Sequence, residues 1–270
     1  MSAVLQVSDL RKAYAGVHAL DGVSFTVDGG SITGLIGPNG SGKSTTIDCI
    51  SGFQKLDSGK VVLAGNDITG QIAHLIARAG MMRTFQTVRV YEKLSLRDNL
   101  AIACQQFDKA TWVDEFLRTR RYRDAVESSE KRARQLVDLI GLQKYYEIET
   151  GILSYGQKKL VALAAALMPH PKIVVLDEPV AGVNPSRIRE IEVALQQLNQ
   201  AGETFLIVEH NVEFITTLCH KVIVLDQGLK LAEGTAAEIH TDSRVLEAYL
   251  GTTPEIAEEE MRAPLMGITP

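Results

Sequence analysis

The sequence predicts an α/β fold with a parallel sheet, and three observations carry this prediction. Residues 172–176 and 204–208 form strands that are almost wholly apolar, which is typical of a parallel sheet buried on both faces. A glycine-rich loop, residues 37–42, joins an apolar strand to a helix. A long segment of helical character, residues 88–168, interrupts the alternation of strands and helices. We therefore expect an α/β core with an inserted helical block.

The first third of the chain predicts strands joined by tight turns. Residues 28–30 and 56–59 are turn signals, and each precedes a run with strand character. A helix is expected from about Lys43 to Ser51, with Gly52 placed to end it. The expected strands in this region are residues 4–7, 23–27, 31–36 and 60–64.

The rest of the chain completes the pattern. Residues 115–140 are dense in charges of both signs, which is typical of a solvated helix face rather than of a nucleic-acid patch. A second amphipathic helix is expected at 188–198, between the two apolar strands. A turn at Gln227-Gly228 joins the expected strands 221–225 and 230–233.

Composition excludes several classes of protein. The chain has 270 residues, of which 45% are hydrophobic and 23% charged, so it is neither disordered nor collagen-like. Its formal charge of −5 does not favour general nucleic-acid binding. The longest apolar run, Val161 to Met168, is far shorter than the roughly 18 to 20 residues that cross a bilayer. No basic-then-apolar signal region opens the chain. The widely spaced Cys49, Cys104 and Cys219 are interpreted as core residues in a reducing cytosol.

One loop carries a phosphate-binding motif. Residues 37–44 match G-x-x-x-x-G-K-[ST] between an apolar strand and a helix. The glycines let backbone N–H groups surround the phosphates, and the helix directs its positive end at the same anion. Lys43 is expected to reach the β- and γ-phosphates, and Ser44 to bind Mg²⁺. The predicted nucleotide-binding residues of this segment are Gly37, Pro38, Asn39, Gly40, Ser41, Gly42, Lys43, Ser44 and Thr45.

Two carboxylates follow the apolar strand 173–176, at the sheet edge where ligands bind in parallel sheets. Asp177 is placed to hold Mg²⁺ through water, and Glu178 to polarise the attacking water. Together with the phosphate loop they predict nucleotide chemistry. Kinases, GTPases, helicases and transport ATPases share these two motifs, so the sequence between the motifs must decide among them.

A third motif, Leu153-Ser154-Tyr155-Gly156-Gln157, stands about twenty residues before Asp177. It resembles the signature of ATP-binding cassette (ABC) ATPases, normally Leu-Ser-Gly-Gly-Gln. The resemblance extends to the Q-loop glutamine, the D-loop, the switch histidine and the aromatic residue that stacks on adenine. These positions are Gln86, residues 181–185, His210 and Tyr14.

The resemblance covers residues 3 to 251 approximately and implies a P-loop NTPase fold. That fold has a RecA-like core with a parallel sheet, an N-terminal antiparallel β subdomain and an inserted α-helical signature subdomain. We expect an ABC ATPase domain over 1–251, with core segments 1–86 and 169–251 and a helical subdomain at about 87–168. The acidic segment 252–270 is interpreted as a mobile tail, with a docked regulatory strip as the alternative.

The resemblance also implies how the residues act. Two cassettes would pair head to tail, so that Ser154, Gly156 and Gln157 of one contact the ATP held by the phosphate loop of the other. Gln86 would sense the γ-phosphate and Mg²⁺. His210 would contact the γ-phosphate and help to hold the water and Glu178. Tyr14 would stack on adenine, with plain packing as its alternative role.

Tyr155 departs from the family pattern, because a glycine normally stands there. Its bulk would face a crowded interface. The sequence Leu-Ser-Tyr-Gly-Gln nevertheless resembles one branch of the family, the ATPases of importers for branched-chain amino acids and related amides or urea. Residues 83–86, the charged stretch from about 105 to 123, Asn184 and residues 248–251 point to the same branch. We therefore expect an active site that tolerates Tyr155.

The leading hypothesis is the ATP-hydrolysing subunit of an importer, working with ATP and Mg²⁺. Its expected partners are a second ABC ATPase, the same or a sister chain, transmembrane permeases that dock near residues 87–100 and, indirectly, a solute-binding protein, but no nucleic acid. The expected location is the cytoplasmic face of the plasma membrane. Two alternatives remain: an exporter ATPase of the kind that extracts lipopolysaccharide, and an ABC ATPase that acts on nucleic acid or ribosomes.

Overall fold

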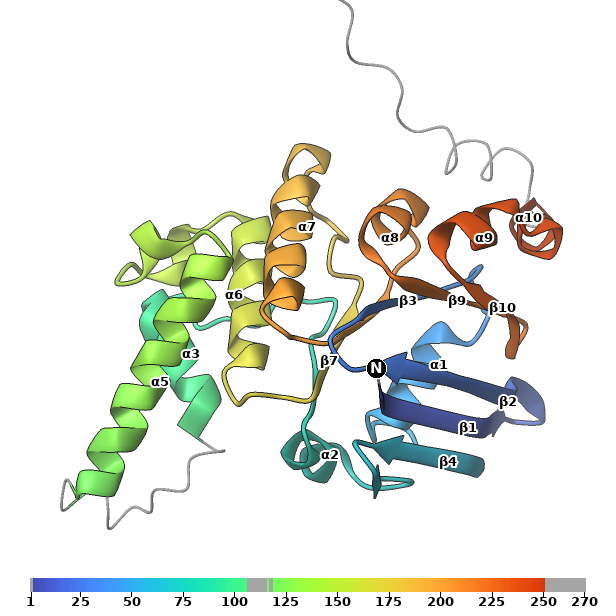
Figure 1. The fold of residues 1–270 in the computed structure, drawn as a ribbon, viewed down its shortest axis with the longest axis horizontal. Helices are drawn as coiled ribbons and strands as arrows, with labels where there is room; N and C mark the ends of the chain where they lie inside the picture. The colour runs from blue at the N-terminus through green and yellow to red at the C-terminus, as the bar shows by residue number, and fades with distance from the viewer. Residues whose placement is uncertain (1, 106–115, 117–118, 251–270) are drawn as a thin grey trace, which may run out of the picture. The chain divides into compact units, whose positions relative to one another are not determined.

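A computed structural model describes residues 2–105, 116 and 119–250 of the chain (Figure 1). The chain divides into two compact units. Unit 1 comprises the described residues within 1–79 and 204–270, and unit 2 comprises those within 80–203. The predicted tail at 252–270 and most of the predicted insertion at 105–123 lie outside the described residues.

An antiparallel sheet forms the N-terminal part of unit 1 (Figure 1). The strands are longer than the sequence predicts, because polar residues such as Lys12 and His18 extend the first hairpin to Tyr14 and Val17. Leu5 and Leu10 of this hairpin are fully buried. In the order β2-β1-β4-β5, the strands are Val17–Asp28, Ala3–Tyr14, Ser58–Leu63 and Asn66–Asp67.

A second group of strands in unit 1 confirms the predicted parallel sheet. Strand β3 (Ile32–Ile36) lies between β8 (Phe205–Val208) and β9 (Lys221–Asp226) and is parallel to both. Every residue of β3 and β8 is buried. Strand β10 (Leu229–Gly234) pairs with β9 as an antiparallel hairpin around the predicted turn.

Helices of unit 1 pack on these strands. Helix α8 (Val212–Leu218) approaches β3 closely, because a Cβ added at Gly34 would lie 2.9 Å from Cγ2 of Ile215 and 3.2 Å from Sγ of Cys219. Helix α1 confirms the predicted helix after the glycine-rich loop. None of the unit's other described helices, α2, α8, α9 and α10, was predicted from the sequence. The bounds of α1, α2, α9 and α10 are Lys43–Ile50, Ala73–Ala79, Ala236–Thr241 and Ser243–Leu250.

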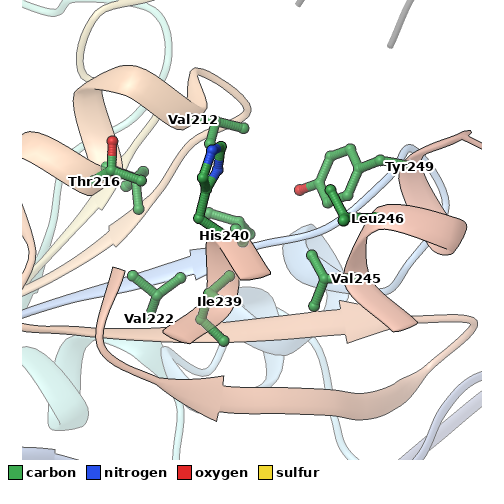
Figure 2. A pocket seen from close by; sticks show the side chains of 10 residues that line it. Val212, Thr216, Val222, Ile239, His240, Val245, Leu246 and Tyr249 are labelled. Atoms are coloured by element: carbon green, nitrogen blue, oxygen red, sulfur yellow. The ribbon is translucent and has the colours of Figure 1, made fainter. Parts of the chain in front are cut away.

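A small apolar cavity of about 50 Å³ lies among α8, α9, α10 and β9 (Figure 2). Val212, Ile239, His240, Val245 and Tyr249 are among the residues that line it. This volume is far below that of a ligand pocket, so the cavity is not a nucleotide site.

Unit 2 combines a pair of parallel strands with a set of helices. Strand β6 (Met81–Arg83) pairs with β7 (Ile173–Asp177), which is the apolar strand predicted at 172–176. Figure 1 shows α3, α5, α6 and α7 side by side, in agreement with their contacts. The helical elements α3, α5, η1, η2, α6 and α7 span Leu96–Gln105, Arg120–Leu139, Gln143–Tyr145, Thr150–Ile152, Tyr155–Leu167 and Pro185–Gln200.

Capping residues fix where the helices of unit 2 begin. Thr119 accepts a hydrogen bond from the backbone of Tyr122 at the start of α5, so the described helix begins later than the predicted residue 115. Asn184 accepts from Ser186 N at 3.0 Å, and Pro185 occupies the first helical position of α7. Asn99 of α3 is buried, and its side chain hydrogen-bonds both the backbone N–H and the carbonyl oxygen of Tyr91, which holds the segment before α3.

In the described part of the chain, no helix is long and apolar enough to cross a membrane.

The cysteines agree in part with the prediction of core residues. Cys49 and Cys219 are buried, whereas Cys104 is half-buried, and none of the three forms a disulfide. Burial raises the pKa of the Cys49 thiol to about 11 and that of the Cys219 thiol to about 12. Both buried thiols are therefore protonated at neutral pH and behave as small apolar side chains.

Candidate nucleotide site

The predicted phosphate loop joins β3 to α1 in unit 1, and its shape depends on glycine. At Gly37, where φ is 151°, an added Cβ would lie 2.1 Å from the carbonyl oxygen of Leu225. At Gly42, where φ is 101°, it would lie 2.7 Å from the carbonyl oxygen of Ala19. Side chains at these two positions would displace the neighbouring backbone, so the sequence requires glycine there.

Helix α1 begins at Lys43 directly after this loop. Gly42 caps the helix without a side chain, and its first turn holds no acidic residue. The positive end of the helix dipole therefore meets no carboxylate of its own turn. The Lys43 ammonium donates to the carbonyl oxygens of Gly37 at 2.7 Å and Pro38 at 3.0 Å, and Ser44 is exposed. These features create a cradle for an anion.

Two further predicted residues lie in the same unit. Tyr14 ends β1 and is 43% exposed, which leaves its ring accessible for stacking. It pairs with Val17 in the hairpin whose Ala19 approaches Gly42. His210 follows β8 with an exposed side chain, and its backbone N–H donates to the buried carboxylate of Glu209 at 3.1 Å. Glu209 therefore fixes the turn that presents His210.

The predicted Mg²⁺ ligand Asp177 ends β7 in unit 2. Its carboxylate forms an ion pair with Arg83 of the parallel strand β6, with an Nη2–Oδ2 distance of 2.9 Å. The two side chains are only 9% and 18% exposed. Arg83 therefore supplies the positive charge that the buried carboxylate needs. The sequence places Arg83 only within the Q-loop motif, and nothing in its spacing predicts this pairing.

Glu178 occupies a strained backbone position beside Asp177. Its φ is +48°, in the left-handed region that residues with a Cβ seldom adopt. One carboxylate oxygen accepts a hydrogen bond from the side-chain amide of Gln86 at 2.6 Å. Its carbonyl oxygen accepts from the Lys159 ammonium at 2.7 Å. The structure thus brings together Gln86 and Glu178, and adds Lys159, which the sequence did not assign to the site.

The signature motif begins α6. The Ser154 hydroxyl accepts from the backbone of Gln157, and the Gln157 side chain accepts from the backbone of Ser154, so the two residues form a capping box. Gly156 is buried, and a Cβ there would lie 3.4 Å from Val183 of the D-loop. The Tyr155 ring is 43% exposed and its hydroxyl lies 3.4 Å from the carbonyl oxygen of Gln86.

The candidate residues therefore form two groups. The phosphate loop, Tyr14 and His210 belong to unit 1, whereas Gln86, the two carboxylates and the signature belong to unit 2. Unit 1 contributes the anion cradle, and unit 2 contributes acidic and amide side chains; the roles predicted for these residues stay predictions.

Comparison with known families agrees with this geometry. A family model described as ABC transporter matches residues 20–181, which includes the phosphate loop, both carboxylates and the signature. The chain belongs to the ABC transporter family. A second model, described as branched-chain amino acid ATP-binding cassette transporter, matches residues 230–254. This ABC protein is an ATPase that binds ATP, and the predicted P-loop NTPase fold with an antiparallel N-terminal sheet is confirmed.

Relatives and solved structures resemble the ABC chain over nearly its whole length. BraF of Pseudomonas aeruginosa, a high-affinity branched-chain amino acid transport ATP-binding protein, is 31% identical over 92% of this chain and 98% of its own. A probable LivG of Archaeoglobus fulgidus, named for the same transport, is 36% identical over 92% of this chain and 95% of its own. The ADP conformation of MJ1267, an ATP-binding cassette of an ABC transporter, has a TM-score of 0.79 at 32% identity and covers 93% of this chain and 100% of its own. These matches confirm the branch that the signature resembles.

Proposed function

We propose that this chain is the ATP-hydrolysing subunit of an importer that takes up branched-chain amino acids or a related small polar solute. One observation carries the proposal: residues 230–254 match the branched-chain amino acid transporter model. The phosphate loop is common to the whole ABC family, but this C-terminal segment belongs to the branch. Relatives named for branched-chain amino acid transport cover 92% of the chain, which supports import over export.

In this proposal, hydrolysis uses the two groups of residues in their predicted roles. Lys43 and the loop N–H groups hold the phosphates, Tyr14 stacks on adenine, and Glu178 polarises the attacking water with help from His210. Ser44, Gln86 and Asp177 would hold Mg²⁺, because each side chain carries an oxygen atom of the hard kind that this ion prefers. Mg²⁺ would neutralise charge on the β- and γ-phosphates.

The proposed function also implies the partners of this chain. A second ATPase subunit would supply the signature that closes each ATP site, through Ser154, Gly156 and Gln157. Permease subunits would anchor the complex at the cytoplasmic face of the membrane, and a solute-binding protein would deliver the solute to them. The expected domain division, with a core at 1–86 and 169–251 and a helical subdomain at 87–168, belongs to this proposal.

A substitution at Glu178 tests the hydrolytic part. The variant Glu178→Gln should keep ATP binding and lose at least about a hundredfold in hydrolysis rate, because a general base contributes on this order. With ATP it should elute from size-exclusion chromatography as a dimer. Glu92→Gln is the matched control, since Glu92 is a carboxylate of unit 2 that is 63% exposed and pairs with Lys158. A Glu178→Gln protein that stays monomeric and hydrolyses ATP normally refutes the role of Glu178.

Uptake by cells tests the transport part. A strain lacking this chain should lose uptake of labelled leucine, and the wild-type chain should restore it where Glu178→Gln does not. Affinity purification of the chain from membranes should recover permeases and a solute-binding protein. Recovery of an export complex, with leucine uptake unchanged in the deletion strain, would favour the exporter alternative.

A further inference from the structure

Four residues of unit 2 form a closed set of contacts that joins the signature helix to the catalytic carboxylate of the same chain. Gln86 donates to the Glu178 carboxylate at 2.6 Å, and Lys159 donates to the Glu178 carbonyl oxygen at 2.7 Å. The Lys159 ammonium lies 5.6 Å from the centre of the Tyr155 ring. The Tyr155 hydroxyl completes the set by donating to the Gln86 carbonyl oxygen at 3.4 Å.

Tyr155 and Lys159 stand four residues apart, on the same side of α6. They therefore reach the Q-loop and the end of β7 from one rigid helix. A Cβ added at Gly182 would lie 3.4 Å from Cε1 of Tyr155, so the ring also rests on the D-loop. A glycine at position 155 would leave the Gln86 carbonyl without this donor and the Lys159 ammonium without the ring.

Lys159 acts on a residue whose backbone needs support. Glu178 has a φ of +48°, and such a conformation persists only where neighbours hold it. Its carbonyl oxygen accepts from the backbone of Ala181 at 3.2 Å and from the Lys159 ammonium. A charged donor forms the stronger hydrogen bond, so Lys159 contributes more to the placement of this residue.

On this basis we infer that Tyr155 and Lys159 are positioning residues for hydrolysis in their own cassette. They link the signature helix to Gln86 and Glu178. The signature would therefore help to position the catalytic residues of its own chain as well as contact the ATP that the partner binds. This inference rests on the proposed function of Glu178. It assigns to the tyrosine, where the family carries glycine, a role within the cassette.

Single substitutions test the two contacts. Lys159→Met should lower kcat about tenfold, because a hydrogen bond from a charged donor is lost at a strained residue. Tyr155→Phe, which removes only the hydroxyl, should lower kcat about threefold, in keeping with a long hydrogen bond. KM for ATP should change less than twofold in both variants, since neither side chain is assigned to the chain's own nucleotide. Lys158→Met is the matched control, because Lys158 neighbours Lys159 and pairs with exposed Glu92.

Combination with Glu178→Gln distinguishes positioning from a general structural role. If Lys159 acts through Glu178, adding Lys159→Met to Glu178→Gln should leave the residual hydrolysis rate unchanged within twofold. A further tenfold loss in the double variant overturns the inference, as does a normal kcat in both single variants. A normal kcat in Glu178→Gln itself would instead refute the proposed function.

Discussion

The ion pair between Arg83 and Asp177 predicts a large and measurable loss of stability when it is broken. Replacement of Arg83 by methionine keeps most of the side-chain volume and removes the charge. The Asp177 carboxylate, which is 18% exposed, would then lose its counter-charge. Breaking a buried pair in this way costs about 3 to 5 kcal/mol, and the partial exposure of Asp177 places the expected loss near the lower value, about 3 kcal/mol.

Arg97 provides a control with a similar ion-pair distance. It pairs with Glu130 in the same unit at 3.0 Å, close to the 2.9 Å of the first pair, but the side chains are 47% and 29% exposed. Exposed pairs contribute about 0.2 to 1 kcal/mol, so Arg97→Met should cost less than 1 kcal/mol. The distances match, but Glu130 also pairs with Arg134 at 2.8 Å, so in Arg97→Met its carboxylate is both more exposed than Asp177 and still paired.

Urea denaturation without nucleotide, followed by circular dichroism, measures the loss of stability in Arg83→Met and in Arg97→Met. Each loss is a shift of the urea midpoint while the m-value, the slope of the unfolding free energy against urea concentration, stays constant. Adding Asp177→Asn to Arg83→Met should recover part of the stability, since no charge then stays buried without a partner. Equal losses below 1 kcal/mol in Arg83→Met and Arg97→Met would refute the reasoning.

Two other predictions concern the phosphate loop and the thiols. Gly37→Ala should abolish ATP binding, because its Cβ would lie 2.1 Å from a backbone oxygen. A Cβ at Gly40 meets nothing within 4 Å, so Gly40→Ala should lose only about tenfold in ATP affinity, through its positive φ. Equilibrium dialysis with labelled ATP measures both affinities. Half-buried Cys104 should react with Ellman's reagent at pH 8 well before Cys49 and Cys219, whose pKa values of about 11 and about 12 keep the thiolate scarce. Equal rates for the three thiols would contradict this.

Local patterns in the sequence were enough to predict the frame of the fold. The strands at 173–176 and 205–208 were predictable because their residues are all apolar, and the hairpin at Gln227-Gly228 because its turn residues are distinctive. Strand β6 was not predictable, since Met81–Arg83 has three residues and no alternation. Helices α2 and α9 have seven and six residues, too few for helical periodicity to stand out.

The candidate site was also predictable only in part. Its motifs are contiguous in sequence, so the phosphate loop and the carboxylates were visible as patterns. The partners of those carboxylates are remote in sequence: Arg83 stands 94 positions from Asp177, and Lys159 stands 19 positions from Glu178. Only the pairing of β6 with β7 and the direction of α6 bring these side chains together. Contacts of this kind depend on tertiary packing and leave no signal in a single sequence.

Tyr155 shows how the structure accommodates a residue that breaks a family pattern. From the sequence alone, its bulk was expected to face a crowded interface. In the structure the ring rests on Gly182 of its own D-loop, and its hydroxyl turns to the carbonyl oxygen of Gln86. Gly156, the next residue, packs near Val183, and Ser154 still caps the helix. The tyrosine therefore makes contacts within its own chain and leaves the helix start intact, while 43% of the residue stays exposed. That the active site tolerates Tyr155 stays a prediction, which the Tyr155→Phe variant tests.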